Sequence, residues 1–121
     1  MSNSKQDDLT KALQVITSTI NKCEKIQPKF NIGTSQHTLL QNRIKALYIS
    51  KSLLLMNGTA QEYSITDLEK ALPPIISIIN KTKKAQSKYE KGSVQYNRYE
   101  PIIKAMQISQ LRLEEELINR K

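Results

Sequence analysis

The 121-residue sequence has no tryptophan, one cysteine, one histidine, three glycines and four prolines. A single cysteine cannot form an internal disulfide, which fits a protein that folds in a reducing compartment. The histidine (His37) and the cysteine (Cys23) belong to no cluster with metal-ligand spacing, and there is no glycine-rich phosphate loop or nucleophile motif. Cys23 lies on an apolar stripe, where a buried, unreactive thiol is expected. We therefore predict a protein that is not an enzyme and that uses no cofactor and no metal.

Long hydrophobic runs are also missing. No apolar stretch approaches the roughly 20 residues that a membrane-spanning helix needs, and the first residues, MSNSKQDDLTKAL, contain no apolar signal-peptide core. Residues 1–121 should form one domain, which at this length removes roughly two thirds of the surface of the unfolded chain. The expected location is the cytoplasm.

Negative charge is scarce, with 11 acidic residues against 19 basic ones and a formal net charge of +8. Such a balance favours acidic partners, namely nucleic acid, anionic lipid or an acidic protein. Fifteen of the basic residues are lysines, however, whereas surfaces that bind phosphate often use the bidentate fork of arginine. Composition alone does not distinguish a basic surface that binds an acidic partner from a lysine-rich surface that has no specific role; the two interpretations are equally supported.

The strongest signal in the sequence is an internal repeat. Residues 8–54 (the first segment) align without a gap on residues 67–113 (the second segment) at an offset of 59, and 21 of the 47 aligned positions are identical. We interpret this as an internal duplication, with residues 57–65 as the linker between the copies.

Within each segment, apolar residues recur at spacings of three and four, which is typical of amphipathic helices. Gly33 and Gly92 should each end a helix, with Thr34 or Ser35, and Ser93, capping the next one. The sequence thus predicts an all-α fold. We expect an antiparallel four-helix bundle in up-down-up-down order, built from two duplicated helical hairpins with approximate twofold symmetry.

Proline restricts helices, and three places in the chain should end or bend them: Pro28, Pro73-Pro74 and Pro101. The first should end its helix near residues 24–27. The consecutive pair should break or kink the third helix between Ala71 and Ile75. Thr66, with Glu69 three residues later, matches a capping box that opens the third helix.

The lysines of the two segments align, and the expected topology would bring them together. In an up-down-up-down bundle the first and third helices are parallel, so their C-terminal ends share one basic pole, where the second and fourth helices begin. Amides at those helix starts could meet an anion beside the lysines, although cations at helix C-termini are also simply favourable for the helix dipole. The candidate anion- or partner-binding residues at this pole are Lys22, Lys25, Lys29, Lys81, Lys84, Lys88, Lys91, Ser35 and Ser93.

The second helix has more apolar residues than one buried face needs, including Leu39, Leu53, Leu55 and Met56. A wide apolar face can be a dimer seam, a partner groove or a surface buried between neighbouring helices.

We predict a small, non-catalytic cytoplasmic protein that acts by protein–protein interaction, of an adaptor, inhibitor or immunity type. It would bind a defined partner or self-associate, for example as a homodimer. The alternative is binding of nucleic acid or another polyanion through the basic pole, with a steep salt dependence. Small basic helical bundles include bacteriocin immunity proteins, but this is a comparison of architecture only, and fold does not imply function.

Overall fold

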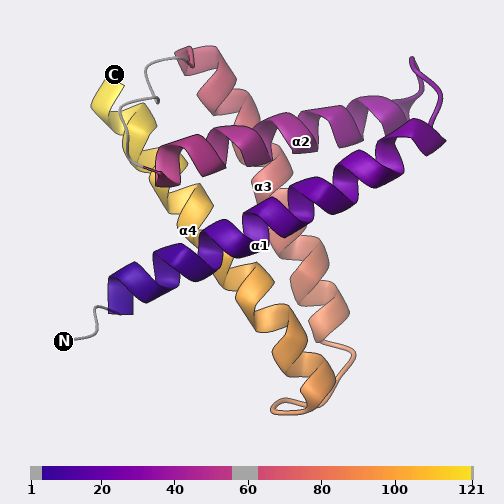
Figure 1. The fold of residues 1–121 in the computed structure, drawn as a ribbon, viewed down its shortest axis with the longest axis vertical. Helices are drawn as coiled ribbons and strands as arrows, with labels where there is room; N and C mark the ends of the chain where they lie inside the picture. The colour runs from indigo at the N-terminus through magenta and orange to yellow at the C-terminus, as the bar shows by residue number, and fades with distance from the viewer. Residues whose placement is uncertain (1–3, 56–62, 121) are drawn as a thin grey trace.

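The computed structural model describes residues 4–55 and 63–120 (Figure 1). Its helices are α1 (Ser4–Ile26), a short 3-10 helix η1 (Gln27–Lys29), α2 (Ser35–Leu54), α3 (Ile65–Gln86) and α4 (Val94–Arg120). These ranges contain no strand, so the prediction of an all-α, four-helix protein is confirmed. Across the described part of the chain, no helix has the length and apolarity that crossing a membrane requires.

The helices form two hairpins that cross each other. The chain turns after α1 and α2 returns beside it, and α3 and α4 repeat this arrangement (Figure 1). Across the hairpins, α2 contacts both α3 and α4, and α4 contacts α1. α1 and α3 cross steeply in Figure 1, so the expected up-down-up-down order of near-parallel helices is not confirmed. The local pattern predicts each helix, but the packing between hairpins decides their relative direction.

One apolar core lies between the four helices. Each helix contributes side chains spaced by three or four residues, as the sequence predicts. The largest apolar side chains that are fully buried are Ile16, Leu47, Ile49, Leu53, Leu68, Ile75, Met106 and Leu113. The core also contains small residues on α2 and α4, which allow neighbouring helices to approach closely.

Two buried serines occupy aligned positions in the two segments. Ser50 Oγ donates to the carbonyl oxygen of Ala46 at 2.9 Å, and Ser109 Oγ donates to that of Ala105 at 3.0 Å. Both serines are almost completely buried. Their hydroxyl groups are therefore satisfied within their own helices, as a buried polar group requires.

The two hairpin turns use the same local chemistry. Gly33 and Gly92 have φ values of 94° and 89°, a left-handed conformation that strains other residues. At the start of α2, Thr34 Oγ1 accepts the backbone amide three residues later at 3.3 Å, and Ser93 Oγ does the same for α4 at 3.1 Å. The predicted turns are confirmed, with Thr34 rather than Ser35 as the cap of α2.

The start of α3 differs from the prediction. Its capping box consists of Ser64 and Asp67, not Thr66 and Glu69. Ser64 Oγ accepts the amide of Asp67 at 3.0 Å, and Asp67 Oδ2 accepts the amide of Ser64 at 3.3 Å. The Asp67 carboxylate also forms an ion pair with Lys45 of α2, a tertiary contact that a local motif does not contain.

The prolines have different effects in different helices. α1 ends at Ile26, directly before η1, which contains Pro28, as predicted. Pro73-Pro74 lies inside α3, which stays helical throughout, so the helix does not break there, and a kink at the pair stays a prediction. A proline in a helix interior costs about 3 kcal/mol, and here buried side chains on both sides of the pair, Leu68 and Ile75, hold the helix together. Pro101 likewise lies inside α4.

Candidate functional site

The lysines that were expected to share one pole lie at two separate corners of the molecule. Because α1 and α3 cross, their C-terminal ends point to different corners (Figure 1). Three lysines belong to the α1/α2 corner and four to the α3/α4 corner: Lys22, Lys25 and Lys29, and Lys81, Lys84, Lys88 and Lys91. The prediction of a single basic pole is therefore wrong, since it depended on parallel first and third helices.

The two serines of the predicted site are also separated, one at each corner. Ser93 Oγ caps α4 and is engaged with the amide of Tyr96. Ser35 is exposed, and its Oγ lies 3.5 Å from Oε1 of Gln36. Neither serine joins the two groups of lysines.

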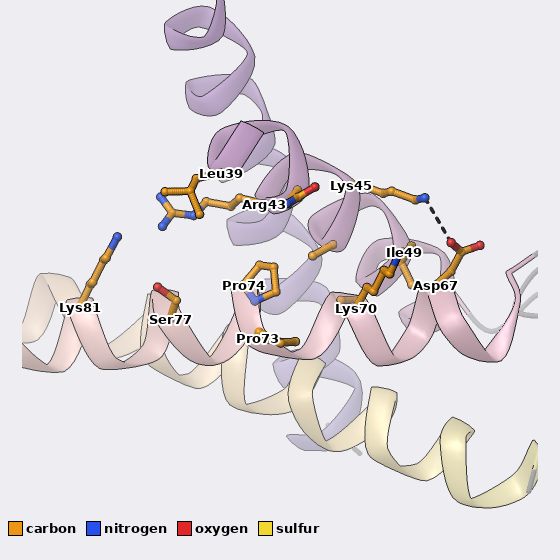
Figure 2. Close-up of a pocket in the computed structure, with 13 residues that line it drawn as sticks. Leu39, Arg43, Lys45, Ile49, Asp67, Lys70, Pro73, Pro74, Ser77 and Lys81 are labelled. Carbon is orange, nitrogen blue, oxygen red and sulfur yellow. Dashed lines mark hydrogen bonds and ion pairs between the residues drawn. The ribbon is translucent and has the colours of Figure 1, made fainter. Parts of the chain in front are cut away.

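A groove that the sequence does not reveal lies between α2 and α3 (Figure 2). Its volume is about 650 Å³, within the range of ligand sites. The apolar part of the lining, which we call the floor, includes the exposed Leu39 and Pro73 and the half-buried Pro74, above the buried side chains of Ala46, Ile49 and Ala71. Along α3 the groove extends from residue 67 to residue 81, which is about 20 Å at the helical rise per residue.

Positive charge surrounds this groove. Arg43 and Lys45 come from α2, and Lys70 and Lys81 come from α3. Lys45 Nζ lies 3.2 Å from Oδ1 of Asp67, the one acidic side chain in the lining. The side chains of the other three cations form no ion pair or hydrogen bond with any part of the chain that the structure describes. Figure 2 shows Arg43 and Lys81 extending towards each other from opposite walls.

The Asp67 carboxylate does not neutralise those three cations. The hydrogen bond from Lys45 is the main cause that lowers the pKa of Asp67, and the backbone amide of Ser64 lowers it further. Asp67 is therefore ionised at neutral pH and already engaged with Lys45 and the α3 capping box. The groove keeps an excess of positive charge.

The aligned positions on α1 and α4 carry different side chains. Arg43 aligns with Ile102, and Pro74 aligns with Val15. Ile102 and Val15 both pack against the hydrophobic core. In the groove, a polar arginine and a compact proline ring take the place of these branched apolar side chains. The open space between α2 and α3 is thus associated with specific differences between the two segments.

Cys23 and His37 are the two residues that the sequence offered for nucleophilic catalysis or metal binding. Cys23 is 7% exposed, and burial is the main cause that raises the pKa of its thiol, against the opposing charge of Arg43. His37 is half-buried in the first turn of α2, where its amide donates to Thr34. Within residues 4–55 and 63–120, no three histidine, cysteine or acidic side chains are grouped to hold a metal ion. The absence of enzymatic activity stays a prediction.

The wide apolar face of α2 is divided between core and surface. Leu53 is buried in the core, whereas Leu39 is 68% exposed and lines the groove. Leu55 is also exposed, and Met56 lies outside the described residues. Burial between neighbouring helices explains part of this face, and Leu39 extends the groove's apolar lining.

Sequence reasoning missed the groove residues Arg43, Lys45 and Lys70. One signal was available, because the alignment of the segments places Pro73-Pro74 opposite Gln14-Val15. The side chains at these aligned positions differ in shape, so the surfaces of the two hairpins differ there. This difference did not show that the two positions face a groove.

Comparisons with protein-family models, with curated protein sequences and with solved structures found no match for this chain. The functional argument therefore depends on the site itself. The residues of two surfaces support such an argument: those of the α2/α3 groove and those of the α3/α4 corner.

Proposed function

We propose that this protein is a non-catalytic binding protein whose α2/α3 groove takes a short acidic segment of a partner protein. The observation that carries the proposal is the set of three cations without counter-ions, Arg43, Lys70 and Lys81, around an apolar floor. Carboxylates of the partner would form charge-assisted hydrogen bonds with these side chains. An apolar side chain of the partner would cover the floor between them.

The length of the groove favours a peptide segment over a single small anion. Lys70 and Lys81 are separated by 11 residues of α3, which corresponds to about 16 Å along the helix. One compact anion cannot meet both. An extended chain advances about 3.3 Å per residue, so a segment of about six residues spans the groove.

Electrostatics should affect the rate and the salt dependence of binding. The uncompensated charge around the groove raises the rate of encounter with an acidic partner. Salt screens this attraction, but the apolar contact with the floor is less sensitive to it. We therefore expect a moderate salt dependence.

Fluorescence anisotropy with a labelled synthetic peptide tests the proposal. The probe is a peptide of about eight residues that combines glutamates with leucines, and its control peptides replace either the glutamates by glutamine or the leucines by serine. The double variant Lys70→Glu/Lys81→Glu should lose affinity by about tenfold or more.

The chain supplies a matched control for that variant. Lys11 and Lys22 align with Lys70 and Lys81 but lie on α1, outside the groove. Lys11→Glu/Lys22→Glu makes the same change in net charge and should alter affinity by less than about threefold. Equal losses in both double variants, or binding that ignores the leucine-to-serine change, would contradict a groove site.

We also propose that the two hairpins are copies related by an approximate twofold axis, each with antiparallel helices. The 21 identities, the matching glycine turns and the matching buried serines support this relationship. Self-association and a cytoplasmic location stay predictions. Light scattering at several protein concentrations tests the first, and imaging of the tagged protein in its host cell tests the second.

A further inference from the structure

Five exposed cations surround the end of the α3/α4 hairpin, which we call the α3/α4 tip (residues 83–100). They are Lys83, Lys84, Lys88, Lys91 and Arg98. None of them forms a salt bridge with a described acidic residue. With two acidic residues, Glu90 and Glu100, the tip has a formal charge of +3.

The aligned end of the first hairpin, the α1/α2 tip (residues 24–41), is much less basic. It has two lysines and one glutamate, for a formal charge of +1. Its lysines, Lys25 and Lys29, align with Lys84 and Lys88. Positive charge is added at three aligned pairs, Glu24/Lys83, Ile32/Lys91 and Leu39/Arg98. Two other pairs, Asn31/Glu90 and Gln41/Glu100, offset part of it.

The α3/α4 tip also presents aromatic rings. Tyr89 and Tyr99 stack with their ring centroids 6.1 Å apart and their planes at 23°. Tyr89 is 41% exposed. The aligned residues of the other tip are Phe30 and Leu40, and Leu40 is buried in the core. Stacked tyrosines within a basic surface are therefore specific to the α3/α4 tip.

Hydrogen bonds across the turn hold this tip in place. Gln86 is buried at the end of α3, and its Nε2 donates to the carbonyl of Tyr96 at 3.1 Å and to Oε1 of Glu100 at 2.9 Å. Ser93 caps α4 in the same turn. A surface that is already ordered loses less entropy when it binds a ligand.

We propose that the α3/α4 tip binds single-stranded nucleic acid. Lys84, Lys88 and Arg98 bind backbone phosphates, and a base stacks on the exposed ring of Tyr89. A single strand suits this surface because its bases are free to stack, whereas those of a duplex are paired. The proposal uses none of the groove residues, so it stands or falls independently of the proposed peptide binding.

Anisotropy with labelled oligo(U) and oligo(dT) of about twelve nucleotides, measured at about 50 and 200 mM salt, tests the proposal. We expect micromolar affinity that falls steeply with salt. Lys84→Gln/Lys88→Gln should weaken binding about tenfold and reduce the logarithmic salt slope by about 1.4, because each phosphate contact contributes about 0.7 for a single strand. The two oligonucleotides show whether the sugar matters.

The other tip provides the controls. Lys25→Gln/Lys29→Gln removes the same charge from aligned positions and should change affinity by less than about threefold. Tyr89→Leu should weaken binding by about fivefold or more, whereas Phe30→Leu should not. Circular dichroism and thermal unfolding confirm that each variant is folded.

Four results would overturn the proposal. They are the absence of saturable binding at the lower salt concentration, equal losses at the two tips, equal affinity for a duplex with no effect of Tyr89→Leu, and tighter binding to phosphatidylserine vesicles with the same dependence on Lys84 and Lys88. The last result would assign the tip to an anionic membrane surface instead.

Discussion

Lys45 Nζ lies 3.2 Å from Oδ1 of Asp67, and this ion pair joins the first hairpin to the start of the second. The aligned residues form the reciprocal pair, in which Lys104 Nζ lies 3.0 Å from Oδ1 of Asp8. Such reciprocal contacts support the twofold relationship that we propose for the two hairpins. All four side chains are partly exposed, so each pair contributes little stability. Each ion pair joins one hairpin to the other, and the two pairs do so at aligned positions.

The capping box of α3 should contribute measurably to stability. Ser64→Ala removes the side-chain acceptor for the amide of Asp67 and should lower the free energy of unfolding by about 1 kcal/mol. Thr66→Ala is the control, because Thr66 is exposed and does not cap the helix; it should change the free energy by less than about 0.5 kcal/mol. Urea denaturation measures both. A larger effect at Thr66 would contradict the assigned cap.

The buried serine of α4 should tolerate a smaller side chain but not a larger one. Ser109 is completely buried, and its hydroxyl bonds only within its own helix. Ser109→Ala should change the free energy of unfolding by less than about 1 kcal/mol, because the better helix propensity of alanine offsets the lost hydrogen bond. Ser109→Leu should cost about 1–3 kcal/mol or more through overpacking. Similar stabilities for the two variants would show that the core near Ser109 is not close-packed.

The prolines of α3 should reduce stability while they keep the groove open. Pro73→Gln/Pro74→Val introduces the aligned residues of α1 and restores two backbone donors. We expect the free energy of unfolding to rise by about 1–3 kcal/mol, less than two full proline penalties because proline also restricts the unfolded chain. The valine side chain should also occupy part of the groove and weaken binding of the acidic peptide. A more stable variant with unchanged peptide affinity would place the peptide elsewhere.

Stability should depend on pH through Glu116. The hydrogen bond from Arg120 is the main cause that lowers the pKa of Glu116, and Arg112 lowers it further, with contacts of 3.0 and 3.1 Å. A lowered folded-state pKa means that this stabilisation is present above the unfolded-state value of about 4.3 and is lost as the pH falls through the folded-state value.

Glu116→Gln should therefore be less stable than the wild type at neutral pH, and the difference should disappear near about pH 2. Glu115→Gln, at an exposed neighbouring position, should behave like the wild type at both pH values. Denaturation of the three proteins across this range measures the effect. A difference that persists in acid would mean that Glu116 acts through packing and not through charge.

The sequence predicts the helices well because their signals are local. Apolar spacing, Gly33, Gly92 and the N-caps act within one or two turns of helix. The crossing of the hairpins is not local, since it depends on how α2 packs against α3 and α4. The same tertiary packing holds α3 helical through Pro73-Pro74, where a local rule predicts a break.

The candidate site was less predictable than the fold. Lysines could be identified in the sequence, but their grouping required the correct direction of α3 relative to α1. Arg43 and Pro74 line the groove, whereas the aligned Ile102 and Val15 pack against the core. Which side chains line a groove and which join the core becomes visible only when the helices are placed in space.

The most direct test of the groove is a titration of the isotope-labelled protein with the glutamate–leucine peptide, followed by amide chemical shifts in NMR spectra. We predict that the shifted amides cluster in residues 39–49 of α2 and 67–81 of α3, the two walls of the groove. The shifts should be absent in Lys70→Glu/Lys81→Glu and present in Lys11→Glu/Lys22→Glu. Shifts confined to the two tips, or spread evenly over all lysine-bearing surfaces, would contradict the account.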